Sequence, residues 1–408
     1  MRACPCRGAC ASGTGTASRW RRCCFRAPTS SPTAACWPSR DGSGSRCGRI
    51  CGGATRRAAH DPVGFRSARS RAAGARRRRS RLGRPGRRLR PVRPLTLASA
   101  APALVLVGAL ALDLAFGDPP NRWHPVAWIG SALAWGRRRL AHGSRAWLLV
   151  AGGAMVVAVA VVAGVAAGVV TAIAARLGVA GMVVEAIALS ALLSVRGLVR
   201  AARLVDGALA RGDLVGARAM VAFHLVSRDA SALDAPRVVS ATVESVAENL
   251  GDSVIAPVCF YLAFGLAGAA VYRAINTADA MLGYREGVLE HFGKVAARLD
   301  DVLNLVPARL SGLAIAAGAA VAGADAGGAW RVMRRDARTT ASPNAGWPMA
   351  AMAGALGVTL EKPGAYRLGD GRLPTRDAIA RAIRVFVAAT VIGMGALALA
   401  RFVLALGV

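Results

Sequence analysis

Residues 146–175 read AWLLVAGGAMVVAVAVVAGVAAGVVTAIAA, a run without a single charged side chain. An α-helix needs about 20 consecutive apolar residues to cross the hydrocarbon core of a bilayer, and this run is longer than that. It consists mainly of alanine, valine and glycine, and such small side chains let helix backbones approach one another closely in lipid. The run therefore predicts a transmembrane helix and, with it, a membrane protein.

Further apolar stretches on both sides extend this prediction to most of the chain, in which 54% of the residues are hydrophobic. The stretch between 197 and 252 is polar at helical spacing and is expected to form cytoplasmic helices. We predict an all-α, multi-pass helical membrane protein with about five spans. The apolar stretches are 97–116, 179–195, 254–271, 310–324 and 383–406.

The sidedness of the spans is open in one region. The segment 117–145 is rich in arginine and is expected on the cytoplasmic side of the cell (inner or plasma) membrane, together with the polar site. Pro257 interrupts 254–271, and 310–324 is short. If both stretches cross, 273–306 lies outside; if they are broken or re-entrant, it stays inside.

The first quarter of the chain has a different composition. Residues 1–94 contain 24 arginines and two acidic residues, and so carry +22 of the formal net charge of +31. Eight of the nine cysteines also lie there, without the C-x-x-C spacing of a zinc site. A basic nucleic-acid-binding arm and a targeting segment are alternatives, but we favour a disordered or non-native extension before a membrane domain over 95–408. No nucleic-acid partner is expected.

Three acidic residues mark the strongest candidate site. Glu244, Glu248 and Asp252 follow one another at four-residue spacing, which places them on one face of a helix. Like charges at this spacing repel one another and weaken an isolated helix. A solvated acidic face is the structural alternative, but the pattern favours a bound cation, and Mg²⁺ commonly uses a few carboxylates together with substrate phosphates.

Polar residues also gather beside the other apolar stretches, where ionisable groups are costly and are functional candidates by default. A turn or a salt-bridge network is the alternative in each case. Asp118 and His124 follow the first stretch, and Ser342 and Asn344 lie in a Ser-Pro-Asn turn. The remaining candidates are Arg228, Asp229, Arg273, Asn276, Asp279, Arg298, Asp300, Asp301, Asn304 and Arg309.

Several common catalytic motifs are absent from the sequence. The only lysines are Lys294 and Lys362, and neither ends a phosphate-binding loop of the Gly-Lys-Ser/Thr type. Neither Gly-x-Ser-x-Gly nor His-Glu-x-x-His occurs. Nucleotide chemistry in this chain would therefore depend on arginine, backbone groups and a metal ion.

Four of these motifs together resemble the CobD/CbiB family, the adenosylcobinamide-phosphate synthases. The likeness covers about 97–408, with the motifs in the family's order and spacing. One departure is Met349, where the family tends to have glutamate after Gly-Trp-Pro. The matching stretches are DLAFGDPPNRWHPVAWIG (113–130), the block 227–284 from SRDASALDAPR to AMLGY, FGKVAARLDDVLNLVPARLSG (292–312) and SPNAGWP with AGALGV (342–358).

The resemblance implies a ligase that forms a carbon–nitrogen bond with ATP and Mg²⁺. It would join 1-aminopropan-2-ol, or its O-phosphate, to a propionate carboxylate of adenosylcobyric acid at the bilayer. The chemistry of each side chain then suggests its role. Glu244, Glu248 and Asp252 are assigned to Mg²⁺; Arg228, Arg273, Arg309, Asp118 and Ser342 to phosphate or substrate; Asp229, Asp279 or His124 to the amine's proton; and Asn276 and Asn344 to the oxyanion.

Two other functions are consistent with a polar site in a membrane protein. A transporter would place the polar residues along a substrate path and would be expected to show paired halves, but the sequence has no such internal repeat. A non-enzymatic signalling protein resembling AmpE would be expected to lose the carboxylate face, which is intact here. We therefore favour the enzyme.

Overall fold

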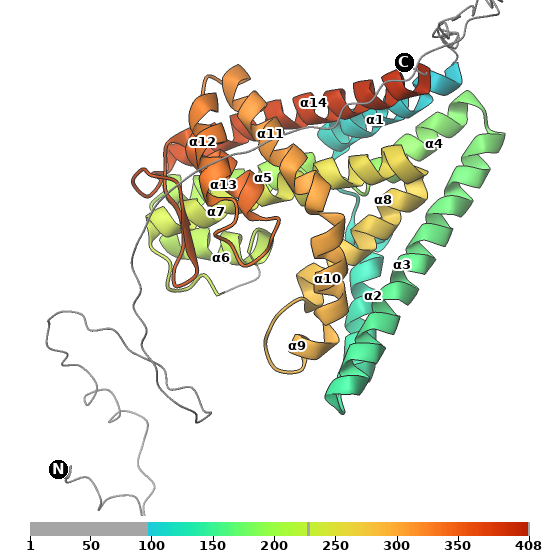
Figure 1. Ribbon diagram of the computed structural model, residues 1–408, viewed down its shortest axis with the longest axis horizontal. Coiled ribbons are helices and arrows are strands. Elements are labelled where there is room, and N and C mark those ends of the chain that lie inside the picture. The colour runs from blue at the N-terminus through green and yellow to red at the C-terminus, as the bar shows by residue number, and fades with distance from the viewer. Residues whose placement is uncertain (1–96, 227–228, 407–408) are drawn as a thin grey trace, which may run out of the picture. The chain divides into compact units, whose positions relative to one another are not determined.

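A computed structural model of the protein describes residues 97–226 and 229–406, and these residues are almost entirely helical (Figure 1). The predicted extension 1–94 and Arg228 lie outside the described residues. The helices of the first half are α1 (Leu97–Phe116), α2 (Pro125–Leu140), α3 (Arg145–Arg176), α4 (Val179–Ser190), α5 (Val195–Ala210), α6 (Leu214–His224) and α7 (Ala235–Leu250). Those of the second half are α8 (Ala256–Leu282), α9 (Leu289–Phe292), α10 (Lys294–Leu303), α11 (Leu305–Val321), α12 (Ala326–Asp336), α13 (Gly346–Leu356) and α14 (Asp377–Leu406).

The structure confirms an all-α, multi-pass membrane protein. Among the described residues, four helical segments are long and apolar enough to cross a bilayer, and a fifth is obtained if α10 and α11, bent by 52°, form one span. Helix α1, which was predicted to span, is apolar but shorter than these four segments over its apolar part, Ala100–Phe116. The four long segments are Arg145–Arg176, Val179–Ala210, Ala235–Leu282 and Asp377–Ala405.

The polar stretch between 197 and 252 was expected to form cytoplasmic helices separate from the spans. The structure differs from this expectation. Helix α7 continues through a single π-helical turn, η2 (Gly251–Ile255), directly into α8. The polar side chains of α7 are not exposed, since Ser240, Thr242 and Glu244 are all buried by neighbouring helices. Polarity at helical spacing therefore marks a buried polar face here, not a surface helix.

Two groups of buried apolar side chains share α8. The first half of α8 belongs to a core that also contains residues of α1, α4, α5, α7 and α11–α14, and its second half belongs to a core with α2, α3, α9 and α10. In Figure 1, α1 and α14 run side by side, and α3 lies along α8. Helix α8 thus connects two packed bundles, and polar residues on it lie where the two bundles meet.

Close glycine contacts fix the short helix α9 and the start of α10 against α3 and the end of α8. A Cβ at Gly152 of α3 would collide with the carbonyl of Phe292, and a Cβ at Gly293 would collide with the carbonyl of Leu282. Any larger residue at these positions must move backbone, which is costly in a packed interior. Glycine here brings α10 close to the end of α8.

A small hairpin follows α13 and was not predicted. Strand β1 (Leu360–Lys362) pairs antiparallel with β2 (Tyr366–Leu368), with Glu361 opposite Arg367. Leu360 and Leu368 are fully buried, so one face of the hairpin packs on the helices. Strands this short leave too brief an alternation to be recognised against the surrounding helical pattern.

Candidate active site

An acidic cavity of about 300 Å³ lies between the end of α7, the second half of α8, α10 and the loop before α13. Among the described residues, five carboxylates line it, and they come from three separate segments of the chain. So many like charges around one small volume need a bound cation or hydrogen-bond donors to offset their repulsion. The five are Glu248, Asp252, Asp279, Asp300 and Asp301.

Amide side chains hold Asp300 in place. The Nδ2 of Asn276 donates to one oxygen of Asp300 at 3.2 Å, and the Nδ2 of Asn304 donates to the other at 3.0 Å. Asn304 is itself buried and accepts a hydrogen bond of 2.9 Å from the hydroxyl of Tyr272. Both oxygens of Asp300 therefore have a fixed direction, which pre-organises this wall of the cavity.

Arg273 is the positive counterpart of the carboxylates. Its Nη1 donates to the carbonyl of Asp252, to Oγ of Ser253 and to Oδ1 of Asn276, each at 3.2 Å. Through Asn276 the guanidinium is linked to Asp300. Arg273 and the acidic cavity therefore belong to one hydrogen-bonded network.

The loop before α13 closes another side of the cavity. Asn344 donates from Nδ2 to the carbonyl of Asp301 at 2.7 Å and accepts from Nη1 of Arg309 at 2.8 Å. The guanidinium of Arg309 also lies 4.7 Å from the ring centroid of Trp347, a cation–π contact. Ser342 accepts the N–H of Asn344 at 3.2 Å. Ser342 and Asn344 line the cavity, and Arg309 binds Asn344 without lining the cavity itself.

The π-helical turn η2 sets the direction of Asp252. A single π turn adds a residue to the helical repeat, and such turns are frequent at functional sites. Gly251 and Asp252 in this turn line the cavity together with Glu248, one turn earlier on α7. Two of the three residues predicted to share a helix face thus reach the cavity.

Glu244, the third of that group, is held on the hairpin side of α7. Its Oε1 accepts from the hydroxyl of Ser240 at 2.7 Å, and its Oε2 accepts from the hydroxyl of Tyr366 at 2.8 Å. The hydroxyl of Tyr366 also lies 3.8 Å from the sulfur of Met349. Glu244 is buried and does not line the acidic cavity.

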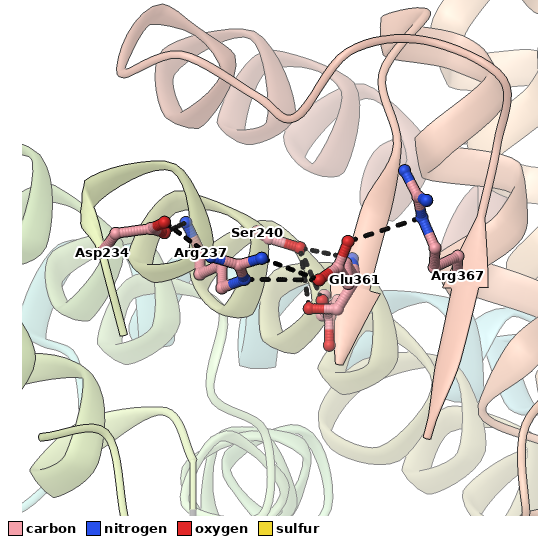
Figure 2. Close-up of polar contacts among 6 residues, drawn as sticks. Asp234, Arg237, Ser240, Glu361 and Arg367 are labelled. Atoms are coloured by element: carbon pink, nitrogen blue, oxygen red, sulfur yellow. Dashed lines mark hydrogen bonds and ion pairs between the residues drawn. The ribbon is translucent and has the colours of Figure 1, made fainter. Parts of the chain in front are cut away.

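Figure 2 shows how the hairpin is attached to α7. Glu361 of β1 lies between Arg237 and Arg367, and the ion pair from Nη2 of Arg237 measures 3.2 Å. The backbone N–H of Glu361 also donates to Oγ of Ser240 at 2.7 Å. The hairpin therefore fixes Ser240 and Tyr366, the two hydroxyls that bind Glu244.

The far end of the hairpin is tied to α12 by Asp336. Arg335 donates to both of its oxygens, and the N–H of Gly369 donates to one of them at 2.8 Å. The hydrogen bonds from Arg335, and then that from Gly369, hold the pKa of Asp336 below its usual value despite partial burial. Its hydrogen bonds to Asp336, and then to Asp370, raise the pKa of Arg335. This pair stays ionised at neutral pH.

The remaining candidates from the sequence lie outside the acidic cavity. Asp229 binds the N–H and the hydroxyl of Ser231, which lower the pKa of its carboxyl and make it a weaker base. His124 caps α2, because its Nδ1 accepts the N–H of Val126, and its Nε2 lies 3.8 Å from Asp118. Of the three residues predicted as proton acceptors, Asp279 is the one that lines the acidic cavity.

The donor set of the cavity suits Mg²⁺ bound together with a phosphate. In the described part of the chain, no group of three or more histidine, cysteine or acidic residues is arranged to hold a metal ion. Mg²⁺ typically takes one or two carboxylates and completes its shell with water and substrate phosphates. Glu248 and Asp252, with Asp300 beside them, fit that partial set.

Three groups of residues in and around the site received no role from the sequence. Asp300 and Asp301 were singled out as candidates, and their adjacency to Asn304 was the available signal. Arg285 lines the cavity from the loop after α8 but stands in no motif. The hairpin residues Glu361 and Tyr366 lie more than a hundred residues from Glu244 and had no local signal.

Removing the Tyr366 hydroxyl should destabilise the protein. Tyr366→Phe takes one hydrogen bond from a buried carboxylate, which costs about 1–3 kcal/mol. Tyr284→Phe is the matched control, because the Tyr284 hydroxyl binds only the carbonyl of Ala280 among the contacts of the described chain. Thermal unfolding in detergent should show a lower midpoint for Tyr366→Phe and little change for the control. Equal midpoints would mean that Glu244 does not depend on the hairpin.

Comparison with known proteins supplies the family context of this site. A family model described as "CobD/Cbib protein" matches residues 106–390. The "Cobalamin biosynthesis protein CobD" of Dehalococcoides mccartyi is 43% identical over 272 residues, which cover 66% of this chain and 88% of that protein. The "Probable cobalamin biosynthesis protein CobD" of Methanothermobacter thermautotrophicus is 41% identical over 65% of this chain and 86% of its own length. No solved structure matches.

Proposed function

The chain belongs to the CobD/CbiB family of cobalamin biosynthesis, and from this we propose that it is an ATP-dependent ligase that attaches an amine to a corrinoid carboxylate. The amine is (R)-1-aminopropan-2-ol or its O-phosphate, and the acceptor is a propionate of adenosylcobyric acid. The observation that supports this most directly is the acidic cavity, with five carboxylates beside Arg273. Such a site suits a nucleotide bound with a cation better than it suits a free anion.

The proposed reaction has two steps. A carboxylate is a poor electrophile, so a propionate oxygen first attacks the γ-phosphorus of ATP, and ADP leaves. The amine nitrogen then attacks the carbonyl carbon of the acyl phosphate, phosphate leaves, and the amine loses a proton. Mg²⁺, when bound with the nucleotide, neutralises phosphate charge and favours the transfer.

We assign each residue of the site a role in these steps from its position. Glu248 and Asp252 hold the cation, and Asp279 accepts the amine's proton, because a carboxylate beside the reacting groups is a suitable base. Arg273 attracts the propionate, since a guanidinium binds carboxylate oxygens strongly. Asn344, on the opposite wall, retains one amide hydrogen for the oxyanion after its bond to Asp301.

The proposed location follows from charge. The arginine-rich segment between α1 and α3 favours the cytoplasmic side of the cell membrane, where ATP is present. Asp118 and His124 belong to that segment. The active site is therefore proposed to open to the cytoplasm.

An activity assay tests the proposal directly. The full chain, purified in detergent, is mixed with adenosylcobyric acid, each amine in turn, ATP and Mg²⁺, and the corrinoid products are separated by mass. We expect an amide with one of the amines, together with ADP and phosphate in equal amounts. Chelation of Mg²⁺ with EDTA should stop the reaction, and excess Mg²⁺ should restore it. No amide with either amine would refute the ligase.

A further inference from the structure

Helix α8 folds back on itself at Gly265. This residue has φ 68° and ψ −165°, outside the helical region, so α8 consists of two helical arms joined at one residue. Arg273, in the second arm, donates to the carbonyl of Asp252, just before the first arm, at 3.2 Å. In one continuous helix these two residues would lie about 30 Å apart along the axis, at 1.5 Å per residue. The second arm therefore runs back beside the first.

Contacts between the two arms repeat this pairing. The rings of Phe260 and Tyr272 stack with 5.0 Å between their centroids, although a straight helix would separate these residues by about 18 Å along its axis. A Cβ at Gly268 would lie 2.7 Å from the carbonyl oxygen of Phe260, so glycine at 268 lets the two backbones approach closely. Residues 251–276 thus form a helical hairpin with its tip at Gly265.

The arms of this hairpin are too short to cross a bilayer. From Ile255 to the tip the first arm extends about 15 Å, whereas the hydrocarbon core is about 30 Å thick. Neighbouring helices cover the arms: Gly164 of α3 leaves room for Val271, and the hydroxyl of Tyr261 donates to Glu185 of α4 at 3.4 Å. A break in the helical backbone at membrane depth is tolerated where protein surrounds it, and within α8 the break is limited to one residue.

Both ends of the hairpin lie level with the ends of α1 and α4. The N–H of Ser194, just after α4, donates to the carbonyl of Ser253 at 3.3 Å, and its hydroxyl donates to Asp118, just after α1, at 3.2 Å. The hydroxyl of Ser253 also accepts from Arg273 at 3.2 Å. The chain after α1, the chain after α4 and the two ends of the hairpin therefore meet in one polar layer.

An apolar cavity of about 1120 Å³ marks the depth of the second arm. It lies between α1, α2, α3, α4 and α8, and Asp118 of the polar layer is at its edge. Leu266 and Ala270 of the second arm form part of its almost entirely apolar wall, together with Trp123 and Trp128. Tryptophans are typical of the membrane interface, and an apolar lining suits acyl chains better than water. The second arm thus runs from the depth of the lipid back to the polar layer.

We infer that residues 251–276 are a re-entrant hairpin, which enters the bilayer and returns to the side from which it came. The sequence left two arrangements open for 273–306, and the hairpin places this segment on the same side as α5, α6 and α7. The acidic cavity, which is lined from both ends of the hairpin, then lies wholly on that side. On the basis of the proposed function, the nucleotide, the amine and the corrinoid all reach the site from one compartment.

The first test labels single cysteines with a membrane-impermeant maleimide. The full chain, with its nine cysteines replaced by alanine, receives Val288→Cys or Glu286→Cys, at exposed positions in the loop after the hairpin. Val215→Cys on α6, at a position 75% exposed, and Leu177→Cys between α3 and α4, at a position 50% exposed, are the references for the two sides. Labelling is measured in right-side-out and in inverted membrane vesicles, with total cysteine determined after solubilisation in SDS.

We expect Val288→Cys and Glu286→Cys to be labelled in the same vesicles as Val215→Cys, and to lose labelling in the vesicles that label Leu177→Cys. Labelling together with Leu177→Cys would overturn the inference, because a crossing span would move the loop to that side. Protection of both loop cysteines in both kinds of vesicle would also overturn it, because the loop would then lie inside the bilayer.

A second test uses the sign of a stability change. Gly265→Ala places a Cβ at φ 68° and ψ −165°, a backbone region essentially restricted to glycine, and should lower the thermal unfolding midpoint in detergent. Gly395→Ala, in α14, is the matched control, because among the described residues no atom lies within 4 Å of a Cβ added at either glycine. The control should keep or raise the midpoint, since alanine favours a helix over glycine.

A midpoint that is kept or raised in Gly265→Ala would mean that Gly265 lies in a continuous helix, and the hairpin would be refuted. Neither test depends on amide formation. The hairpin stands if the purified protein forms no amide, and a crossing span would leave the proposed ligase chemistry in place.

Discussion

Glu248→Gln should reduce ATP-dependent amide formation to a small residual rate while the protein stays folded. The substitution keeps the size of the side chain and removes one negative charge from the acidic cavity, where Glu248 lies beside Asp252. Loss of one pre-organised electrostatic contact typically lowers kcat by about 10²–10³-fold. The measurement is amide production by purified protein, with thermal unfolding as the check on folding.

The control for this prediction is Glu290→Gln, an identical substitution at an exposed position of α9. It should leave kcat unchanged within error. A metal role for Glu248 further predicts that residual activity of Glu248→Gln requires more Mg²⁺ for half-maximal rate than the wild type does. Full activity at the same Mg²⁺ concentration would exclude Glu248 as a ligand.

Arg273→Lys should reduce kcat/KM for the corrinoid on the order of 100-fold, although the positive charge is retained. The Arg273 guanidinium binds Asp252, Ser253 and Asn276 simultaneously. All three bonds come from Nη1, so a lysine ammonium placed there would lack the Nε and Nη2 donors that the guanidinium keeps for a substrate carboxylate. The positive charge beside the acids is kept, while the second and third donor nitrogens are lost.

The kinetic signature of Arg273→Lys distinguishes positioning from folding. If Arg273 receives the propionate, KM for the corrinoid should rise much more than KM for ATP. Arg331→Lys, at an exposed position of α12 away from the cavity, should change neither. Equal increases in both KM values, together with a lower unfolding temperature, would mean that Arg273 stabilises the fold and does not bind the propionate.

The membrane fold could be predicted from local sequence alone. The apolar run at 146–175 corresponds to α3, and the run at 383–406 lies within α14. Hydrophobic length is a local property, because each transmembrane helix satisfies its backbone hydrogen bonds within its own segment. The four-residue spacing of Glu248 and Asp252 also predicted that they share a side of the helix, and both line the cavity, although the π-helical turn η2 sets the final direction of Asp252.

The composition of the site depended on tertiary packing. Asp279, Asp300 and Asn344 come from different helices and loops. Close glycine contacts hold α9 and α10 against the end of α8, and a hydrogen bond to the carbonyl of Asp301 joins Asn344 to α10. Glu244 satisfied the same helical periodicity as Glu248, yet the hairpin, more than a hundred residues away, binds it elsewhere. Periodicity fixes only the direction of a side chain around its own helix axis. Which neighbour it meets is decided by the packing of distant segments. The same packing formed the apolar cavity and the hydrogen bonds that lead from its edge to Arg273.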